Sequence, residues 1–196
     1  MASSSSTTRN WRDSLYLAFF FISFASMFLV DLVHFIPHSL WVPPSSPLHF
    51  LQQIRNFYTS TYHDLFLLTP WPQQPTFFRL FTILELVYQL PAVAWILRRY
   101  FRDGREGAVA GKTGGTTPAL ELACLVYGVQ CALTTLTCIY DCLEWEGELY
   151  TWEVKKELIF KLYMPWFLIP LGMSVDMYLR ILNRFRGQGE KTLKSQ

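Results

Sequence analysis

Apolar residues are gathered into four long blocks along the chain, and polar stretches separate these blocks. The blocks cover residues 15–36, 78–97, 120–143 and 158–182. Each approaches the roughly 20 residues that an α-helix needs to cross a bilayer. A helix of a soluble bundle keeps a polar face, but the first block contains LYLAFFFISFASMFLV, which has none. The pattern therefore predicts an all-α membrane protein built as a four-helix transmembrane bundle.

Prolines interrupt the second and fourth blocks. Pro91 lies inside the second, and Pro165 and Pro170 lie inside the fourth. Proline lacks a backbone N–H and obstructs the helical turn before it. We therefore expect helices 2 and 4 to bend and to leave space between them.

The connection between the first two blocks, about residues 37–76, is long for a structureless loop. Within it, Leu48, Leu51, Ile54 and Tyr58 have nearly the spacing of one helical face. This spacing predicts a short amphipathic helix in the first connection, which we expect to be lumenal.

We expect a single transmembrane domain over residues 11–184. Residues 1–10 and 185–196 are expected to be cytosolic tails, and residues 101–117 a flexible cytosolic linker. Arg9 and Arg12 before the first block also fit a cleaved signal peptide. The apolar run is longer than in such a peptide, which favours a retained helix.

Composition and charge narrow the function. Hydrophobic residues make up 51% of the chain and charged residues 16%, well below the roughly 25% charged residues of soluble domains. The net charge of +2 does not favour nucleic acid as a partner. Most lysines and arginines lie in the two tails and the second-to-third connection, which predicts that both termini are cytosolic.

Cysteines 124, 131 and 138 recur every seven residues on one stripe of the third helix. Their spacing matches no zinc pattern, so they are interpreted as packing residues. No metal and no cofactor are expected.

Three acidic residues stand in apolar surroundings: Asp31, Asp64 and Glu85. A charge at bilayer depth costs about 2.5–3.5 kcal/mol, so such residues usually face the interior of a bundle. Gln89 follows Glu85 by four residues and shares its helical face. Two neighbouring buried acids share a proton, and the remaining negative charge in an aromatic pocket suits a hydrophobic cation. Alternatively, each acid is protonated and only bonds a neighbouring helix.

Four stretches of the sequence, FLVDLVHFIP, FFRLFTILELVYQLP, YGVQCALTT and YMPWFLIP, resemble the sigma-2 receptor family of EXPERA-domain membrane proteins. The resemblance covers all four spans in order. It implies a four-helix fold in the endoplasmic reticulum membrane, a homodimer, and a pocket open to lipid that binds sterols or cationic amphiphiles. It also implies a role in sterol homeostasis and intracellular cholesterol transport, with a sterol-transport protein as partner.

The resemblance assigns roles by position. Asp31 would pair with a ligand amine, and Asp64 would be protonated and hydrogen-bond Asp31. The residues implied to line the rest of the pocket are Glu85, Gln89, Tyr58, Tyr127, Thr134, Tyr163 and Trp166. Trp166 stands where the family has tyrosine, and the C-terminal tail lacks the family's dense lysine cluster.

Two other functions stay open. The emopamil-binding protein, also of the EXPERA superfamily, is a sterol isomerase whose second helix carries His-x-x-x-Glu. Here Phe81 stands four residues before Glu85 and this helix has no histidine. This argues against isomerisation, which needs a proton donor and a proton acceptor beside the sterol. A tetraspan scaffold that binds no ligand is the other alternative.

Overall fold

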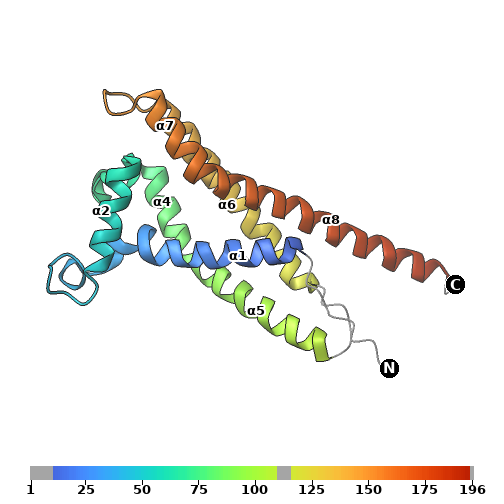
Figure 1. Cartoon of the computed structure of the whole chain (residues 1–196). Coiled ribbons are helices and arrows are strands. Elements are labelled where there is room, and N and C mark those ends of the chain that lie inside the picture. The colour runs from blue at the N-terminus through green and yellow to red at the C-terminus, as the bar shows by residue number, and fades with distance from the viewer. Residues whose placement is uncertain (1–10, 110–115, 195–196) are drawn as a thin grey trace.

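The computed structural model describes residues 11–109 and 116–194, and within these ranges it contains helices and turns but no strand (Figure 1). The α-helices are α1 (Trp11–Ser26), α2 (Phe50–Tyr62), α3 (Leu65–Leu68), α4 (Thr76–Leu84), α5 (Leu90–Val109), α6 (Pro118–Glu144), α7 (Trp152–Leu158) and α8 (Met164–Lys194). The 3₁₀ turns are η2 (Val33–Phe35), η3 (His38–Leu40) and η4 (Trp71–Gln73). The π-helical turns are η1 (Met27–Asp31), η5 (Glu85–Gln89) and η6 (Ile159–Tyr163).

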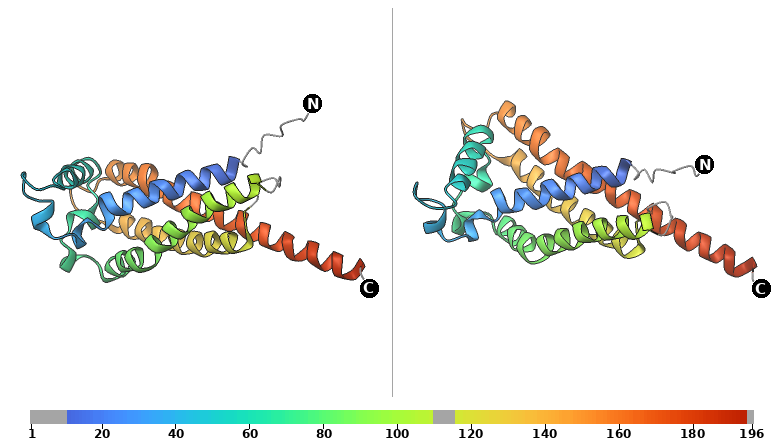
Figure 2. Two further views of the ribbon diagram at one scale, coloured as in Figure 1. Left: turned by 90° about the horizontal axis from the view of Figure 1, so that it is seen from below. Right: turned by 60° about the horizontal axis from the view of Figure 1, so that its bottom comes forward.

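Four continuous helical segments are long and apolar enough to cross a membrane: Trp11–Asp31, Thr76–Arg102, Pro118–Glu144 and Trp152–Arg186. They run in alternating directions, so α1 begins and α8 ends at the same end of the bundle (Figure 2). The connections that contain α2, α3 and residues 145–151 lie at the other end. The predicted four-helix bundle is confirmed, and the chain is a multi-pass membrane protein.

Before Pro91 and Pro165 the second and fourth spans widen into a π turn, whereas Pro170 lies inside α8 without interrupting it. The N–H of Leu90 donates to the carbonyl of Glu85, and Pro91 follows. In the same way, the N–H of Met164 donates to the carbonyl of Ile159, and Pro165 follows. A proline ring clashes with the carbonyl four residues before it. A five-residue turn before each proline moves the backbone out of the regular helical path.

The most extensive helix contact is between α6 and α8, and a glycine permits their close approach. A Cβ atom on Gly128 would collide with Oγ of Ser174 and would lie 2.7 Å from the carbonyl oxygen of Pro170. Small residues at helix contacts let two backbones approach closely in a membrane protein. The third and fourth spans are therefore held against each other at Gly128.

Charged side chains from three spans meet at the end of the bundle where α1 begins. Arg180 of α8 pairs with Asp13 of α1 and with Asp176, both at 2.7 Å. Arg184 of α8 pairs with Glu121 of α6 at 2.8 Å. Asp13 and Glu121 are buried, and a buried charge is tolerated only when it is paired. These ion pairs fix α1 and α6 against α8.

The short amphipathic helix predicted in the first connection is α2. Leu51 on one face is buried against Val33 and Trp41, whereas Phe57 on another face is 67% exposed. The helix ends at Tyr62, and the φ of 51° at the C-cap residue His63 places it in the left-handed region. Asp64 follows directly and stands at the start of α3.

Two boundaries differ from the sequence expectation. The linker expected at residues 101–117 is helical as far as Val109, and α8 continues to Lys194, beyond the expected fourth-span end at 182 and into the expected tail. Arginine and lysine are good helix formers, so a helix can continue past its apolar part into water. The expected tail at residues 1–10 and residues 110–115 of the linker lie outside the described residues.

Candidate functional site

The three π turns face one pocket. Met27, Asp31, Glu85, Gln89 and Tyr163 all line it, and each belongs to η1, η5 or η6. A π turn inside an α-helix frequently marks a functional site. The first π turn has no proline after it. It closes with a 2.9 Å bond from the N–H of Leu32 to the carbonyl of Met27, where the helical span ends.

The pocket has a volume of about 220 Å³ and draws residues from all four spans and from α2. Its lining residues are Ser26, Met27, Val30, Asp31, Tyr58, Glu85, Gln89, Cys131, Thr134, Thr135, Leu162, Tyr163 and Trp166. The walls are mainly apolar and aromatic, and two carboxyl groups stand among them. This composition is typical of a small-molecule site, with a few polar groups that orient the ligand.

Asp64 lies directly behind the pocket wall and is held by several donors. The hydroxyls of Tyr58 and Tyr163 donate to Oδ2 of Asp64 at 3.1 and 2.9 Å. The N–H of Phe66 donates to Oδ1 at 2.9 Å, so Asp64 is also the N-cap of α3. Burial raises the pKa of Asp64, and the hydrogen bonds oppose that shift because they favour the charged form.

Asp31 and Glu85 are in the opposite situation. Within the described part of the chain, no side chain donates a hydrogen bond to either carboxyl group or to the amide of Gln89. All three side chains line the pocket. The polar end of the pocket therefore presents two carboxyl groups and one amide whose hydrogen-bonding capacity is available to a ligand.

The three carboxyl groups lie close enough to interact electrostatically. The charge of Asp64 acts on Asp31, and the charge of Asp31 acts on Glu85. The resemblance implied a hydrogen bond between Asp31 and Asp64. No such bond occurs among the described residues, where the oxygens of Asp64 accept from Tyr58, Tyr163 and Phe66 instead.

Most of the other residues that the resemblance implies do lie in the pocket. Tyr58, Thr134, Tyr163 and Trp166 line the pocket. Tyr127 does not, because its ring is buried in the core beside Phe20, at a centroid distance of 5.2 Å.

Sequence reasoning missed Ser26, Met27, Val30, Cys131, Thr135 and Leu162, which also line the pocket. Cys131 had been interpreted as a packing residue, and it is buried. Its thiol lies 3.8 Å from the carbonyl oxygen of Trp166 and donates to it. Pro170, four residues later, removes the normal donor to that carbonyl. The presence of Pro170 was therefore the available signal for a polar partner on a neighbouring helix.

A second hollow of about 420 Å³ lies between α1 and α8. Its walls are apolar except for Arg12, Tyr16 and Asp176. Arg12 and Tyr16 both donate to the carboxylate of Asp176, at 2.9 and 3.2 Å. Because these polar groups already bond one another, this groove is the weaker candidate for ligand recognition.

Comparison with known proteins places the chain in a family. The sequence matches the family described as EBP: EXPERA (EXPanded EBP superfamily) over residues 50–177. The chain belongs to the EXPERA family. The match runs from the start of α2 into α8 and includes Asp64, Glu85 and Tyr163, whereas Asp31 lies before it.

Two yeast proteins of the same name are similar to this EXPERA protein. The Efficient mitochondria targeting-associated protein 19 of Schizosaccharomyces pombe is 34% identical over 176 residues, which cover 90% of this chain and 80% of the relative. The protein of that name from Saccharomyces cerevisiae is 27% identical over 154 residues, which cover 74% of this chain and 87% of the relative.

Proposed function

We propose that this EXPERA protein binds sterols and cationic amphiphiles inside the membrane, in the manner of the sigma-2 receptor family. The observation that carries the proposal is the pair of carboxyl groups, Asp31 and Glu85, which line a largely apolar cavity without a hydrogen-bonding partner among the described residues. Both side chains are only partly exposed, and a carboxylate in largely apolar surroundings without a partner is unfavourable. A ligand ammonium would provide that partner.

The surroundings of Asp31 support a cation as the ligand group. Tyr58, Tyr163 and Trp166 bring aromatic rings to the cavity, and the faces of such rings attract cations. Asp64 adds a second acidic group close to Asp31. A sterol carries no cation, and its hydroxyl would form hydrogen bonds at the same acidic end.

We also propose the setting of this activity. The chain resides in the endoplasmic reticulum membrane as a homodimer with both termini cytosolic. It takes part in sterol homeostasis and intracellular cholesterol transport together with a sterol-transport protein. The clustering of basic residues in the tails and the second-to-third connection supports this orientation.

The direct test is Asp31→Asn in the purified full chain. We expect the affinity for a lipophilic amine to fall by roughly 30-fold or more, because the charged partner of the ammonium is lost. Asp141→Asn is the matched control. It also removes one carboxylate, but Asp141 lies outside the pocket lining and accepts a hydrogen bond from Trp145. Equal amine affinity in wild type and Asp31→Asn would remove Asp31 from the proposed role.

We propose further that the chain is not a sterol isomerase. All four histidines of the sequence fall in the described residues, and none lines the pocket. His34 lies nearest along the chain to Asp31 and stacks on Trp71 instead. Purified protein is expected not to move the double bond of a ring-B unsaturated sterol. Turnover that Glu85→Gln abolishes would reverse this conclusion.

The yeast relatives suggest a second candidate function, an association with efficient targeting to mitochondria, as their names state. The similarity over 90% of this chain supports it. The test measures delivery of a reporter precursor to mitochondria in cells that lack this protein. It repeats the measurement in the same cells after the wild-type protein or Asp31→Asn has been expressed in them. If delivery falls in cells without the protein and only the wild type restores it, ligand binding and mitochondrial targeting are linked. If delivery is unchanged in cells without the protein, the targeting function is excluded.

A further inference from the structure

We infer that the preferred ligand of the pocket is a long-chain amino alcohol, a single-tailed amphiphile with an ammonium and a neighbouring hydroxyl. This inference rests on the proposed function, because it specifies the ligand class of the same pocket. It comes from the number and kind of available groups at the polar end, which exceed what a simple amine or a sterol can satisfy.

The polar end offers three separate hydrogen-bonding groups. Asp31 and Glu85 each present a carboxyl group, and Gln89 presents an amide that can both donate and accept. Gln89 is only 5% exposed, and within the described residues its side chain has no hydrogen-bond partner. A buried amide without a partner is unfavourable, so the ligand is expected to satisfy it.

The π turn places two of these groups together. Glu85 is the first residue of η5 and Gln89 the last, and both reach the cavity that Asp31 lines from η1. The available groups are therefore supplied from two separate spans. A ligand with two polar groups on adjacent carbons can contact both spans at once.

Each ligand class leaves different groups of the pocket without a hydrogen-bonding partner. The ammonium of an n-alkylamine satisfies Asp31, but the molecule carries no oxygen to accept from the amide of Gln89. A sterol hydroxyl can donate to Glu85 and accept from Gln89, but it leaves Asp31 without a cation. An amino alcohol places its ammonium at Asp31, while its hydroxyl donates to Glu85 and accepts from Gln89.

The rest of the pocket fits a single alkyl chain. Met27, Val30 and Leu162 provide flexible or branched aliphatic walls, and Trp166 provides a flat one. Methionine adapts to irregular apolar surfaces. The cavity of about 220 Å³ is smaller than the roughly 300–1,000 Å³ of pockets for drug-sized ligands, so it can hold the polar head of a ligand and only the first part of its tail.

The experiment compares two probes of equal chain length, a long-chain amino diol and the corresponding n-alkylamine, by competition against one labelled lipophilic amine on the purified full chain. In wild type, the amino diol is expected to bind about tenfold more tightly than the alkylamine, because its hydroxyl gains two hydrogen bonds at buried groups. In Glu85→Leu and Gln89→Leu, this ratio is expected to fall to about three, since one of the two bonds is lost in each.

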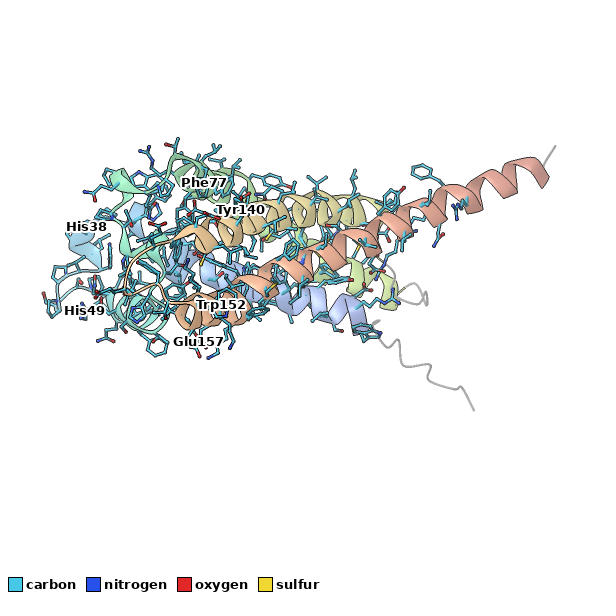
Figure 3. All side chains as sticks on the ribbon, turned by 90° about the horizontal axis from the view of Figure 1, so that it is seen from above. His38, His49, Phe77, Tyr140, Trp152 and Glu157 are labelled. Atoms are coloured by element: carbon cyan, nitrogen blue, oxygen red, sulfur yellow. The ribbon has the colours of Figure 1, made fainter. Side chains whose placement is uncertain are left out.

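Glu157→Leu is the matched control for the loss of a carboxylate. Glu157 pairs with Lys161 at 2.8 Å, does not line the pocket, and lies on the outer surface of α7 (Figure 3). The control is expected to keep the tenfold ratio. Loss of the ratio in Glu157→Leu as well as in Glu85→Leu would overturn the inference, because the effect would then not arise in the pocket.

Two further outcomes separate this inference from the proposed function. If both probes bind wild type equally and Asp31→Asn weakens both, the amine site stands and the amino-alcohol preference is refuted. If neither probe displaces the labelled amine and Asp31→Asn has no effect, the proposed function fails, and the ligand class fails with it.

Discussion

The hydroxyl of Tyr163 donates a 2.9 Å hydrogen bond to Oδ2 of Asp64, although the two residues lie 99 positions apart in the sequence. Tyr58 donates to the same oxygen at 3.1 Å. Asp64 therefore joins η6 of the fourth span to α2 and to the turn before α3. The same bonds fix the positions of two tyrosines that line the pocket.

Tyr163→Phe tests this connection. The change removes one donor from a buried carboxyl group, so we expect the free energy of unfolding to fall by about 1–3 kcal/mol. The measurement is unfolding of the purified protein in one detergent. Tyr178→Phe is the control, because Tyr178 is 56% exposed, and its effect should stay within about 0.5 kcal/mol. Equal stability of wild type and Tyr163→Phe would show that the bond does not hold the two elements together.

His34 predicts a pH dependence of stability. Its ring stacks on Trp71 at 4.5 Å, and burial together with the charge of Arg55 lowers its pKa from 6.5 to about 4. Between these two values the unfolded chain binds a proton that the folded chain does not. This contribution to stability is fully present above pH 6.5 and is lost progressively as the pH falls toward 4.

The measurement compares unfolding of wild type and His34→Phe at several pH values between 7 and 4. Phenylalanine keeps a ring against Trp71 and does not titrate, so the variant should lose less stability on acidification than wild type does. The carboxyl groups titrate in both proteins, and only the difference between the two slopes reports His34. Parallel slopes would contradict the assignment.

The spans could be predicted from sequence because the bilayer imposes a length and an apolar composition on each of them. The interruptions at Pro91 and Pro165 could be predicted because proline acts on its own backbone. The π turn at Met27–Asp31 could not, since no proline follows it and the turn forms where the first span ends. Asp31 was recognised as an acid in an apolar setting, but the turn that presents it was not.

The partners of Asp64 could not be predicted from spacing either. They depend on the left-handed turn at His63 and on the packing of η6 against that turn. Asp13 and Glu121 were not recognised at all, because each lies near the polar end of a span, where charge is common. Their burial arises only when α8 supplies Arg180 and Arg184.

Gly128→Ala tests the close contact between α6 and α8. A methyl group at this position would meet Ser174 and the backbone of Pro170, and backbone cannot move aside as a flexible side chain can. Overpacking of this kind costs about 1–3 kcal/mol. Gly172→Ala is the matched control, because its Cβ would have no atom within 4 Å. The measurement is thermal unfolding of both variants, and equal stability of the two would refute the contact.

Arg180→Gln tests the ion pairs that fasten α1 to α8. The change leaves Asp13 and Asp176 close together without their shared cation, and Asp13 is only 4% exposed. Removing one partner of a buried pair typically costs about 3–5 kcal/mol. Lys161→Gln breaks the exposed pair with Glu157 and should leave the stability close to that of wild type, because water screens an exposed pair. In the double variant Asp13→Asn/Arg180→Gln, part of the lost stability should return, because the side chain at position 13 no longer carries an unpaired charge. A double variant as unstable as the sum of the two single variants would show that the two side chains act independently.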